Sequence, residues 1–197
     1  MKIDEDVDLF DAANQRDVLK SILSSSDTSK TIHENIDILL TIIPEIEPMI
    51  GFEHQNPYHH LDVWEHTILA VSLAPDEEFD TRLALLLHDI GKPHSWSQDG
   101  DIRHFYGHGA VSEQISRAVL ERLEFPKEYI DEMCVIIKNH DEPLTETDVM
   151  NNRDLSIKTF KVQICDCLAH NPNKYGKRLD YLANITDMFN NIDLQKH

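Results

Sequence analysis

Basic residues are scarce in this chain. Its 197 residues include 18 lysines and arginines but 36 aspartates and glutamates, which gives a formal net charge of −18. Sequence-independent binding to nucleic acids depends on contacts between lysine or arginine and the phosphates. An acidic protein also repels long polyanions. The composition therefore argues against a general nucleic-acid-binding protein.

Long apolar runs and secretion signals are missing too. No stretch reaches the ~18 apolar residues of a membrane span. The first six residues, MKIDED, lack the order of a signal peptide, in which basic residues precede apolar ones. Three cysteines, Cys134, Cys165 and Cys167, cannot all pair within the chain, and the last two point apart on a helix. We interpret them as core residues of a reduced cytoplasmic protein.

Alternating strand patterns, repeats and low-complexity tracts are also absent, and apolar residues recur at helical spacing instead. The length suits one domain with a sizeable core. We divide it into an N-terminal acidic arm with one short helix, residues 1–30, and a helical domain, residues 31–197. The predicted fold is all-α, an irregular bundle. The predicted helices span residues 9–23, 32–43, 61–73, 81–90, 111–123, 127–139, 156–170 and 174–192.

The pair His88-Asp89 is the most informative feature of the sequence. It ends an apolar helix that is then stopped by Gly91 and Pro93. Burying an unpaired carboxylate is costly, so Asp89 requires a cation or a dense set of hydrogen-bond donors. An imidazole and a carboxylate side by side at a buried helix end indicate a divalent metal site.

Four further candidate ligands lie on other predicted helices or at their ends. Taken singly, His66, His108 and His140 would each serve as a hydrogen-bonded or helix-terminal histidine. Asp166 is harder to explain without an ion, because apolar residues surround it on its helix. The order His, His-Asp, His, His, Asp on successive helices favours a metal centre.

The candidate ligands are compatible with two forms of metal centre. A mononuclear site would use His66, His88, Asp89 and Asp166. A binuclear site, which we favour, adds His108 and His140, with Asp89 as the bridge because a carboxylate has two oxygens. Nitrogen and oxygen donors suit Mn, Fe, Co, Ni or Zn better than Mg alone. Such an ion activates a bound water and polarises a phosphoryl oxygen.

Substrate-binding residues are expected around the irregular segment 91–109 and the segment 153–178, which holds six basic residues against two aspartates. The basic segment is either a solvated face or a phosphate-attracting patch. Lys92 is expected to offset negative charge on a phosphoryl group. The alternative is that its ammonium interacts only with the dipole at the C-terminus of the helix. The predicted substrate-binding residues are Lys92, Arg103, His104, Lys174 and Arg178, and the predicted catalytic residues are Asp89 and Lys92.

The ordered set His66, His88-Asp89, Asp166 resembles the pattern of the HD-domain metal-dependent phosphohydrolases. Flanking sequences are similar to the HD domain of bacterial CCA-adding enzymes (tRNA nucleotidyltransferases) over about residues 40–192. These sequences are NPYHHLDVWEHT at 56–67, LLHDIGKP at 86–93, FYGH at 105–108, LEFP at 123–126 and AHNP at 169–172. The resemblance implies a helical bundle of the HD type with one or two divalent ions: Mn, Fe, Ni, Co, Mg or Zn.

The sequence departs from those enzymes because no nucleotidyltransferase head, with its Gly-Ser and Asp-x-Asp signatures, precedes the domain. We therefore expect an HD module that cannot add nucleotides to tRNA. One expected function is hydrolysis of small phosphoesters, such as nucleoside monophosphates or 2′,3′-cyclic nucleotides. A second is another HD activity, on dinucleoside polyphosphates or nucleotide triphosphates. A third is a non-catalytic module that binds tRNA, a nucleotide or a protein, although the net charge does not support tRNA.

Overall fold

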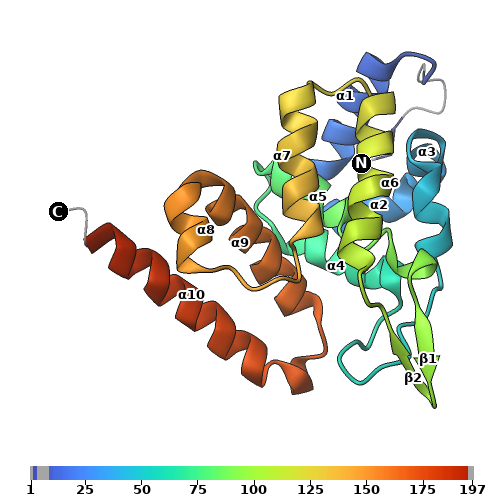
Figure 1. The fold of residues 1–197 in the computed structure, drawn as a ribbon. Coiled ribbons are helices and arrows are strands. Elements are labelled where there is room, and N and C mark those ends of the chain that lie inside the picture. The colour runs from blue at the N-terminus through green and yellow to red at the C-terminus, as the bar shows by residue number, and fades with distance from the viewer. Residues whose placement is uncertain (1, 4–8, 195–197) are drawn as a thin grey trace.

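The computed structural model describes residues 2–3 and 9–194 (Figure 1). The prediction of an all-α fold is confirmed. The helices are α1 (Ala12–Leu23), α2 (Thr28–Glu34), α3 (Ile36–Ile42), α4 (Val63–Leu73), α5 (Phe79–Leu87), α6 (His108–Arg122), α7 (Lys127–Lys138), α8 (Glu146–Asn151), α9 (Arg153–Ala169) and α10 (Gly176–Leu194). Three 3₁₀ turns are η1 (Pro44–Met49), η2 (Lys92–His94) and η3 (Pro172–Lys174), and two strands are β1 (Ser97–Asp99) and β2 (Ile102–His104).

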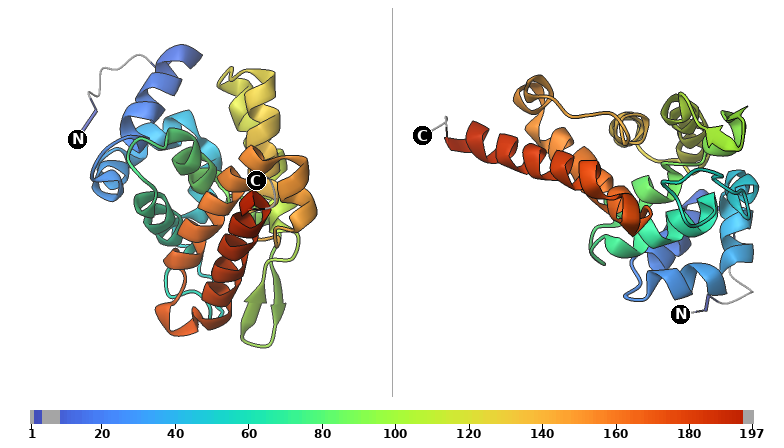
Figure 2. Two further views of the ribbon diagram at one scale, coloured as in Figure 1. Left: turned by 90° about the vertical axis from the view of Figure 1, so that its left-hand side faces the viewer. Right: turned by 90° about the horizontal axis from the view of Figure 1, so that it is seen from below.

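Two groups of buried apolar side chains hold the bundle together. The large core draws on helices α1 to α7 and on α9. The small core consists of Val149, Ile185 and Phe189, which come from α8 and α10, with partly buried neighbours from α9. Figures 1 and 2 show α10 running beside α8 and α9 and extending away from the rest of the molecule. Among the described residues, no helix combines the length and apolar character needed to cross a bilayer.

The N-terminal segment is part of the large core. Val18, Leu19, Ile22 and Leu23 of α1 are buried there. Arg82, buried in α5, ties this segment to the bundle, since its guanidinium donates to the backbone oxygen of Leu23 at 2.6 Å. The division of the chain at residue 30 stays a prediction.

Two local expectations were wrong, and one short helix was not predicted. The single helix predicted over 32–43 is split at Asn35, whose side-chain amide donates to Thr31 O and whose side-chain oxygen accepts from Ile3 N. An antiparallel hairpin pairs Ser97 with His104 inside the segment expected to be irregular. It turns at Gly100, whose φ of +56° suits glycine. Helix α8 was missed because it has only six residues.

Candidate metal centre

The six predicted ligands come from five helices or their ends. His66 lies on α4, His88 and Asp89 follow α5, and His108 begins α6. His140 follows α7, and Asp166 lies in the last turns of α9. The large core packs these helices together, so residues 100 positions apart in the sequence share one buried site.

Four of the six side chains converge on one point. Asp166 Oδ1 lies 2.9 Å from His66 Nε2 and 3.5 Å from His88 Nε2. Asp89 Oδ2 lies 3.2 Å from His88 Nε2 and 3.6 Å from His66 Nε2. These spacings fit donors around one shared ion, since metal bonds to imidazole and carboxylate are about 2 Å long.

The other oxygen of Asp89 faces a second pair of histidines. Asp89 Oδ1 lies 3.4 Å from His108 Nε2 and 3.6 Å from His140 Nε2. The two imidazole nitrogens are 3.1 Å apart. One carboxylate therefore borders two sets of donors, which is the arrangement expected of a residue that bridges two ions.

The histidines are oriented for coordination before any ion binds. Nδ1 faces a backbone oxygen in each: Leu85 O for His88 at 2.6 Å, Phe105 O for His108 at 2.8 Å, and Ile137 O for His140 at 2.7 Å. A carbonyl oxygen only accepts, so the neutral ring carries its proton on Nδ1 and presents the lone pair of Nε2 to the centre. Such outer contacts typically hold histidine ligands in place.

Two buried atoms of the centre lack hydrogen-bond partners among the described residues. They are His88 Nε2 and Asp89 Oδ1. Leaving buried polar atoms unsatisfied is costly. A divalent cation beside Asp89 Oδ2 would satisfy His88 Nε2, and one beside His108 and His140 would satisfy Asp89 Oδ1. The donor set and its unsatisfied atoms therefore fit a divalent metal ion.

The carboxylates of Asp89 and Asp166 give the site negative charge, and nearby cationic side chains compensate this charge. Burial raises the pKa of the Asp89 carboxyl, but His88 and Lys92 outweigh it and hold the pKa well below its usual value. Burial lowers the pKa of His88, but Asp89 and Asp166 outweigh it and raise the pKa to about 10. In contrast, burial lowers the pKa of His108 to about 4. The lowered pKa of both carboxyls keeps them available as anionic ligands.

Two glycines allow the helices to approach closely enough to assemble the site. A Cβ on Gly91 would lie 2.6 Å from His108 O, and one on Gly109 would lie 2.5 Å from Lys138 O. The first contact brings the end of α5 against the start of α6, and the second brings α6 against α7. Any side chain at these positions would separate the ligand-bearing helix ends.

An open cleft of about 710 Å³ lies beside the centre. Of the residues predicted to bind substrate, its lining includes Lys92, Arg103, His104 and Arg178. Lys174 lies in η3, exposed and outside this lining.

Three of the basic side chains that line the cleft have partners within the protein. Lys92 Nζ lies 2.6 Å from Asp89 Oδ2, and Arg178 Nη1 lies 3.7 Å from Asp166 Oδ2. The Arg103 guanidinium lies over the ring of Phe52 and donates to the backbone oxygen of Glu53 at 2.6 Å. Lys92 and Arg178 are therefore tied to the acidic residues of the centre, whereas Arg103 is held at the rim.

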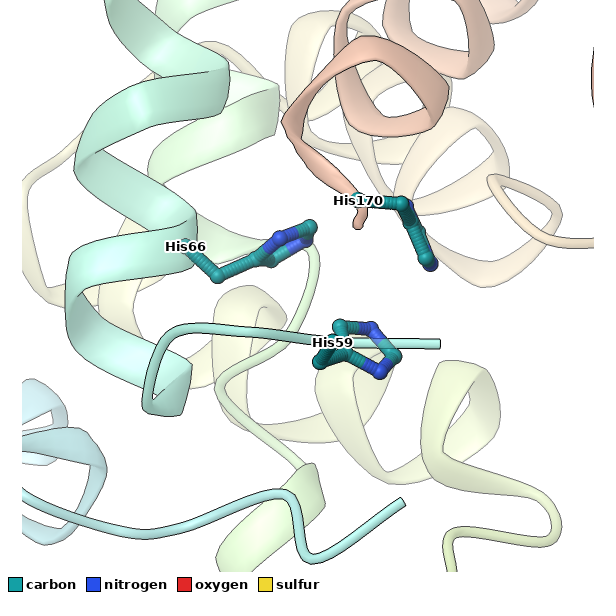
Figure 3. A group of neighbouring side chains, drawn as sticks. All are labelled: His59, His66 and His170. Atoms are coloured by element: carbon teal, nitrogen blue, oxygen red, sulfur yellow. The ribbon is translucent and has the colours of Figure 1, made fainter. Parts of the chain in front are cut away.

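Sequence reasoning missed three histidines beside the centre. His54 and His59 stack at 3.6 Å between ring centroids, and His170 lies 4.3 Å from His59. His59 and His170 contributed to the family resemblance through their flanking motifs, but no spacing rule marked them as neighbours of His66. Figure 3 shows the rings of His59, His66 and His170 facing a common space.

Comparison with known proteins identifies a family and several relatives. The family model described as HD domain matches residues 58–171. A CC-adding tRNA nucleotidyltransferase from Thermus thermophilus is 37% identical over 119 residues, which is 57% of this chain and 27% of that protein. An A-adding tRNA nucleotidyltransferase from Deinococcus radiodurans is 33% identical over 146 residues, which is 70% of this chain and 33% of that protein. The chain thus spans a third or less of the length of these relatives.

Proposed function

The chain belongs to the HD-domain family, whose members include metal-dependent phosphohydrolases, and on that premise we propose that it hydrolyses small phosphoesters. Nucleoside monophosphates and 2′,3′-cyclic nucleotides are the proposed substrates. One observation carries the proposal: the two oxygens of Asp89 border two separate groups of imidazole nitrogens in a buried site next to an open cleft.

The proposed binding residues divide into two groups that share Asp89. His66, His88 and Asp166 would hold one divalent ion, and His108 and His140 the other. A bound ion supplies Lewis acidity and lowers the pKa of a coordinated water.

Lys92 would act on the substrate side of the centre. Its ammonium pairs with Asp89 Oδ2 at 2.6 Å, so a phosphoryl oxygen that enters the cleft would compete for the same cation. Lys92 would then offset the negative charge that develops on the phosphoryl group during hydrolysis. Arg178, on α10, would offset the same negative charge, because it also borders the cleft.

The size and lining of the cleft support a substrate of nucleotide size. Small-molecule sites typically enclose about 300–1,000 Å³, and the cleft of about 710 Å³ falls in this range. Phe105 and Tyr106 line it, and the Tyr106 ring stacks on His104 with 5.2 Å between centroids. Exposed aromatic rings suit a stacked base. The net charge of −18 disfavours a long polyanion.

Metal analysis followed by a substrate panel tests the proposal. Chelator-treated protein is supplied with Mn, Ni, Co or Mg, and phosphate release or cyclic-phosphate opening is measured on mononucleotides, 2′,3′-cyclic nucleotides and duplex DNA. We expect turnover of the small substrates and little or none of the duplex. Faster hydrolysis of duplex DNA would contradict the assignment.

The Asp89→Asn variant tests the role of the centre. It keeps the shape of the side chain but removes its charge, so metal affinity should fall by more than about 100-fold and turnover should be lost. Asp101→Asn, on the exposed turn of the hairpin, is the matched control and should behave as the parent protein. Full turnover and full metal content in Asp89→Asn would move the chemistry elsewhere.

A second proposed function is supported by the names of the relatives, which act on tRNA. The chain would then bind tRNA or a nucleotide without turnover. A filter-binding assay with tRNA, at stated salt concentration, separates the two functions. Tight tRNA binding together with inactivity on every substrate would favour the binding module.

A further inference from the structure

A third group of metal donors adjoins the centre and consists only of imidazoles. One ring nitrogen from each of His59, His66 and His170 lies within 4.8 Å of the other two. His66 and His170 are buried, and His59 lies at the wall of the cleft. The rings come from the loop before α4, from α4 and from the end of α9, and they face one space (Figure 3).

Backbone and amide oxygens orient these three rings as they orient the histidines of the centre. His170 Nδ1 lies 2.7 Å from Asp166 O, and His59 Nδ1 lies 2.9 Å from Asn56 Oδ1. His66 Nδ1 faces Ala169 O at 3.3 Å. Because each oxygen accepts, the neutral rings of His59 and His170 carry their proton on Nδ1 and keep the lone pair of Nε2. His66 Nε2 also lies 2.9 Å from Asp166 Oδ1, so it would bind an ion in place of that contact.

The orientation of His59 is itself supported. The same Asn56 Oδ1 accepts from the backbone N–H of Tyr58 at 3.1 Å, and the Asn56 amide donates to His54 O at 3.3 Å. The nearest cation, Lys92 Nζ, is 3.5 Å from His59 Nε2, whereas it is 2.6 Å from Asp89. Lys92 thus binds the carboxylate more closely than the imidazole, and an ion would replace only its long contact with His59 Nε2.

We propose that His59, His66 and His170 form an additional zinc-binding site, called the zinc seat below, which shares His66 with the HD centre. Three imidazoles with an open fourth position are a donor set that Zn²⁺ accepts, and imidazole ligands favour Zn, Cu and Ni over Mn and Mg. The carboxylates of the centre also suit Mn and Mg, which prefer oxygen donors. The site with three imidazoles is therefore the more selective of the two.

Sharing His66 makes the new seat antagonistic to the centre. One ring nitrogen has one lone pair, so His66 Nε2 binds either the ion near His88 and Asp89 or the zinc near His59 and His170. Zinc in the new seat leaves the first ion with His88, Asp89 and Asp166. Excess zinc should therefore inhibit the enzyme, a consequence that rests on the proposed phosphohydrolase function, whereas zinc binding itself does not.

The binding test uses the full chain, stripped by chelator and titrated with Zn²⁺ alone. Long-range proton–nitrogen NMR spectra report coordination at each imidazole. At saturation we expect the Nε2 signals of His59 and His170 to shift as coordinated nitrogens, while those of exposed His60 stay unchanged. Unchanged His59 and His170 signals at saturating zinc would overturn the proposal without any variant being made.

A pair of variants gives a second, independent readout. By equilibrium dialysis and elemental analysis, the double variant His59→Gln/His170→Gln should retain one zinc fewer per chain than the parent protein. The matched control, His60→Gln/His94→Gln, changes two exposed histidines and should retain the parent's full content. Equal zinc content in all three proteins would contradict the additional seat.

An inhibition experiment distinguishes failure of this inference from failure of the proposed function. With Mn²⁺ as activator, added zinc should inhibit the parent protein at lower concentration than it inhibits His59→Gln/His170→Gln. Equal sensitivity would refute the antagonism. A parent protein inactive with every metal would refute the phosphohydrolase, and the NMR and dialysis results would still decide the zinc seat.

Discussion

The large core and the small core differ in what they hold in place. The large core surrounds the metal centre, and it keeps Asp89 and Asp166 at 0% and 4% exposure. The small core buries three apolar side chains and none of the predicted ligands. Helix α9, which carries Asp166, also packs Ile157 and Phe160 against it, and Arg178 of α10 lies 3.7 Å from Asp166. The ligands thus depend on the part of the molecule that buries the most apolar surface, and α10 adds a charge at the rim.

The largest expected effect on stability comes from Arg82→Met in the large core. Arg82 is 1% exposed, donates to the backbone oxygens of Leu23, Ser25 and Ala74, and pairs with Asp76. Its loss leaves buried carbonyl oxygens unpaired, so the free energy of unfolding should fall by about 3 kcal/mol. Urea unfolding of the metal-free chain measures this change.

A surface arginine provides the control. Arg117 pairs with Glu113 and Asp131 on the exposed side of α6 and α7, and Arg117→Met should lower the free energy of unfolding far less than Arg82→Met. Equal losses in the two variants would show that Arg82 does not hold the N-terminal helix against the bundle.

An intermediate effect is expected from Phe189→Ala in the small core. Phe189 packs on Phe160 with 5.7 Å between ring centroids, and the Arg153 guanidinium lies over it. Truncation should cost about 2 kcal/mol, below the usual loss for a fully enclosed aromatic because this cluster is small. Metal content should be unchanged. Loss of the bound metal in this variant would show that the two cores are energetically coupled.

The smallest effect is expected from Asp148→Ala at the start of α8. Asp148 and Thr145 form a capping box, and hydrogen bonds from Thr145 lower the pKa of the Asp148 carboxyl. The variant should lose about 1 kcal/mol at neutral pH. A lowered pKa stabilises the folded state above the unfolded pKa, and this contribution disappears as pH falls through the folded value. The stability difference should therefore shrink below pH ~4, and a difference that grows there would refute this explanation.

Local sequence signals predicted the ligands better than they predicted the connections. His88 and Asp89 were identifiable because a charged pair ended an apolar helix, and Asp166 because apolar neighbours surrounded it. The structure brings all six candidate ligands together, and their roles remain proposals. The hairpin at 97–104 could not be predicted, since each strand has only three residues and too few positions for an alternating pattern.

Long-range proximity explains the other omissions. His59 and His170 meet only because the loop before α4 packs against the end of α9, where Asn171 N donates to Tyr58 O at 2.9 Å. No sequence spacing encodes that contact. The break at Asn35 has a similar origin, because the side chain of Asn35 accepts a hydrogen bond from Ile3, 32 residues earlier.

The two glycines between the ligand helices make the centre vulnerable at positions that carry no chemistry. Gly91 and Gly109 determine how far α6 stands from its neighbours, and therefore the distance between His108 and Asp89. A methyl group at either position would push the helices apart and enlarge the distance between His108 and Asp89, while every candidate ligand stays in the sequence. In a collection of natural variants, loss of function at these glycines would arise from altered spacing alone.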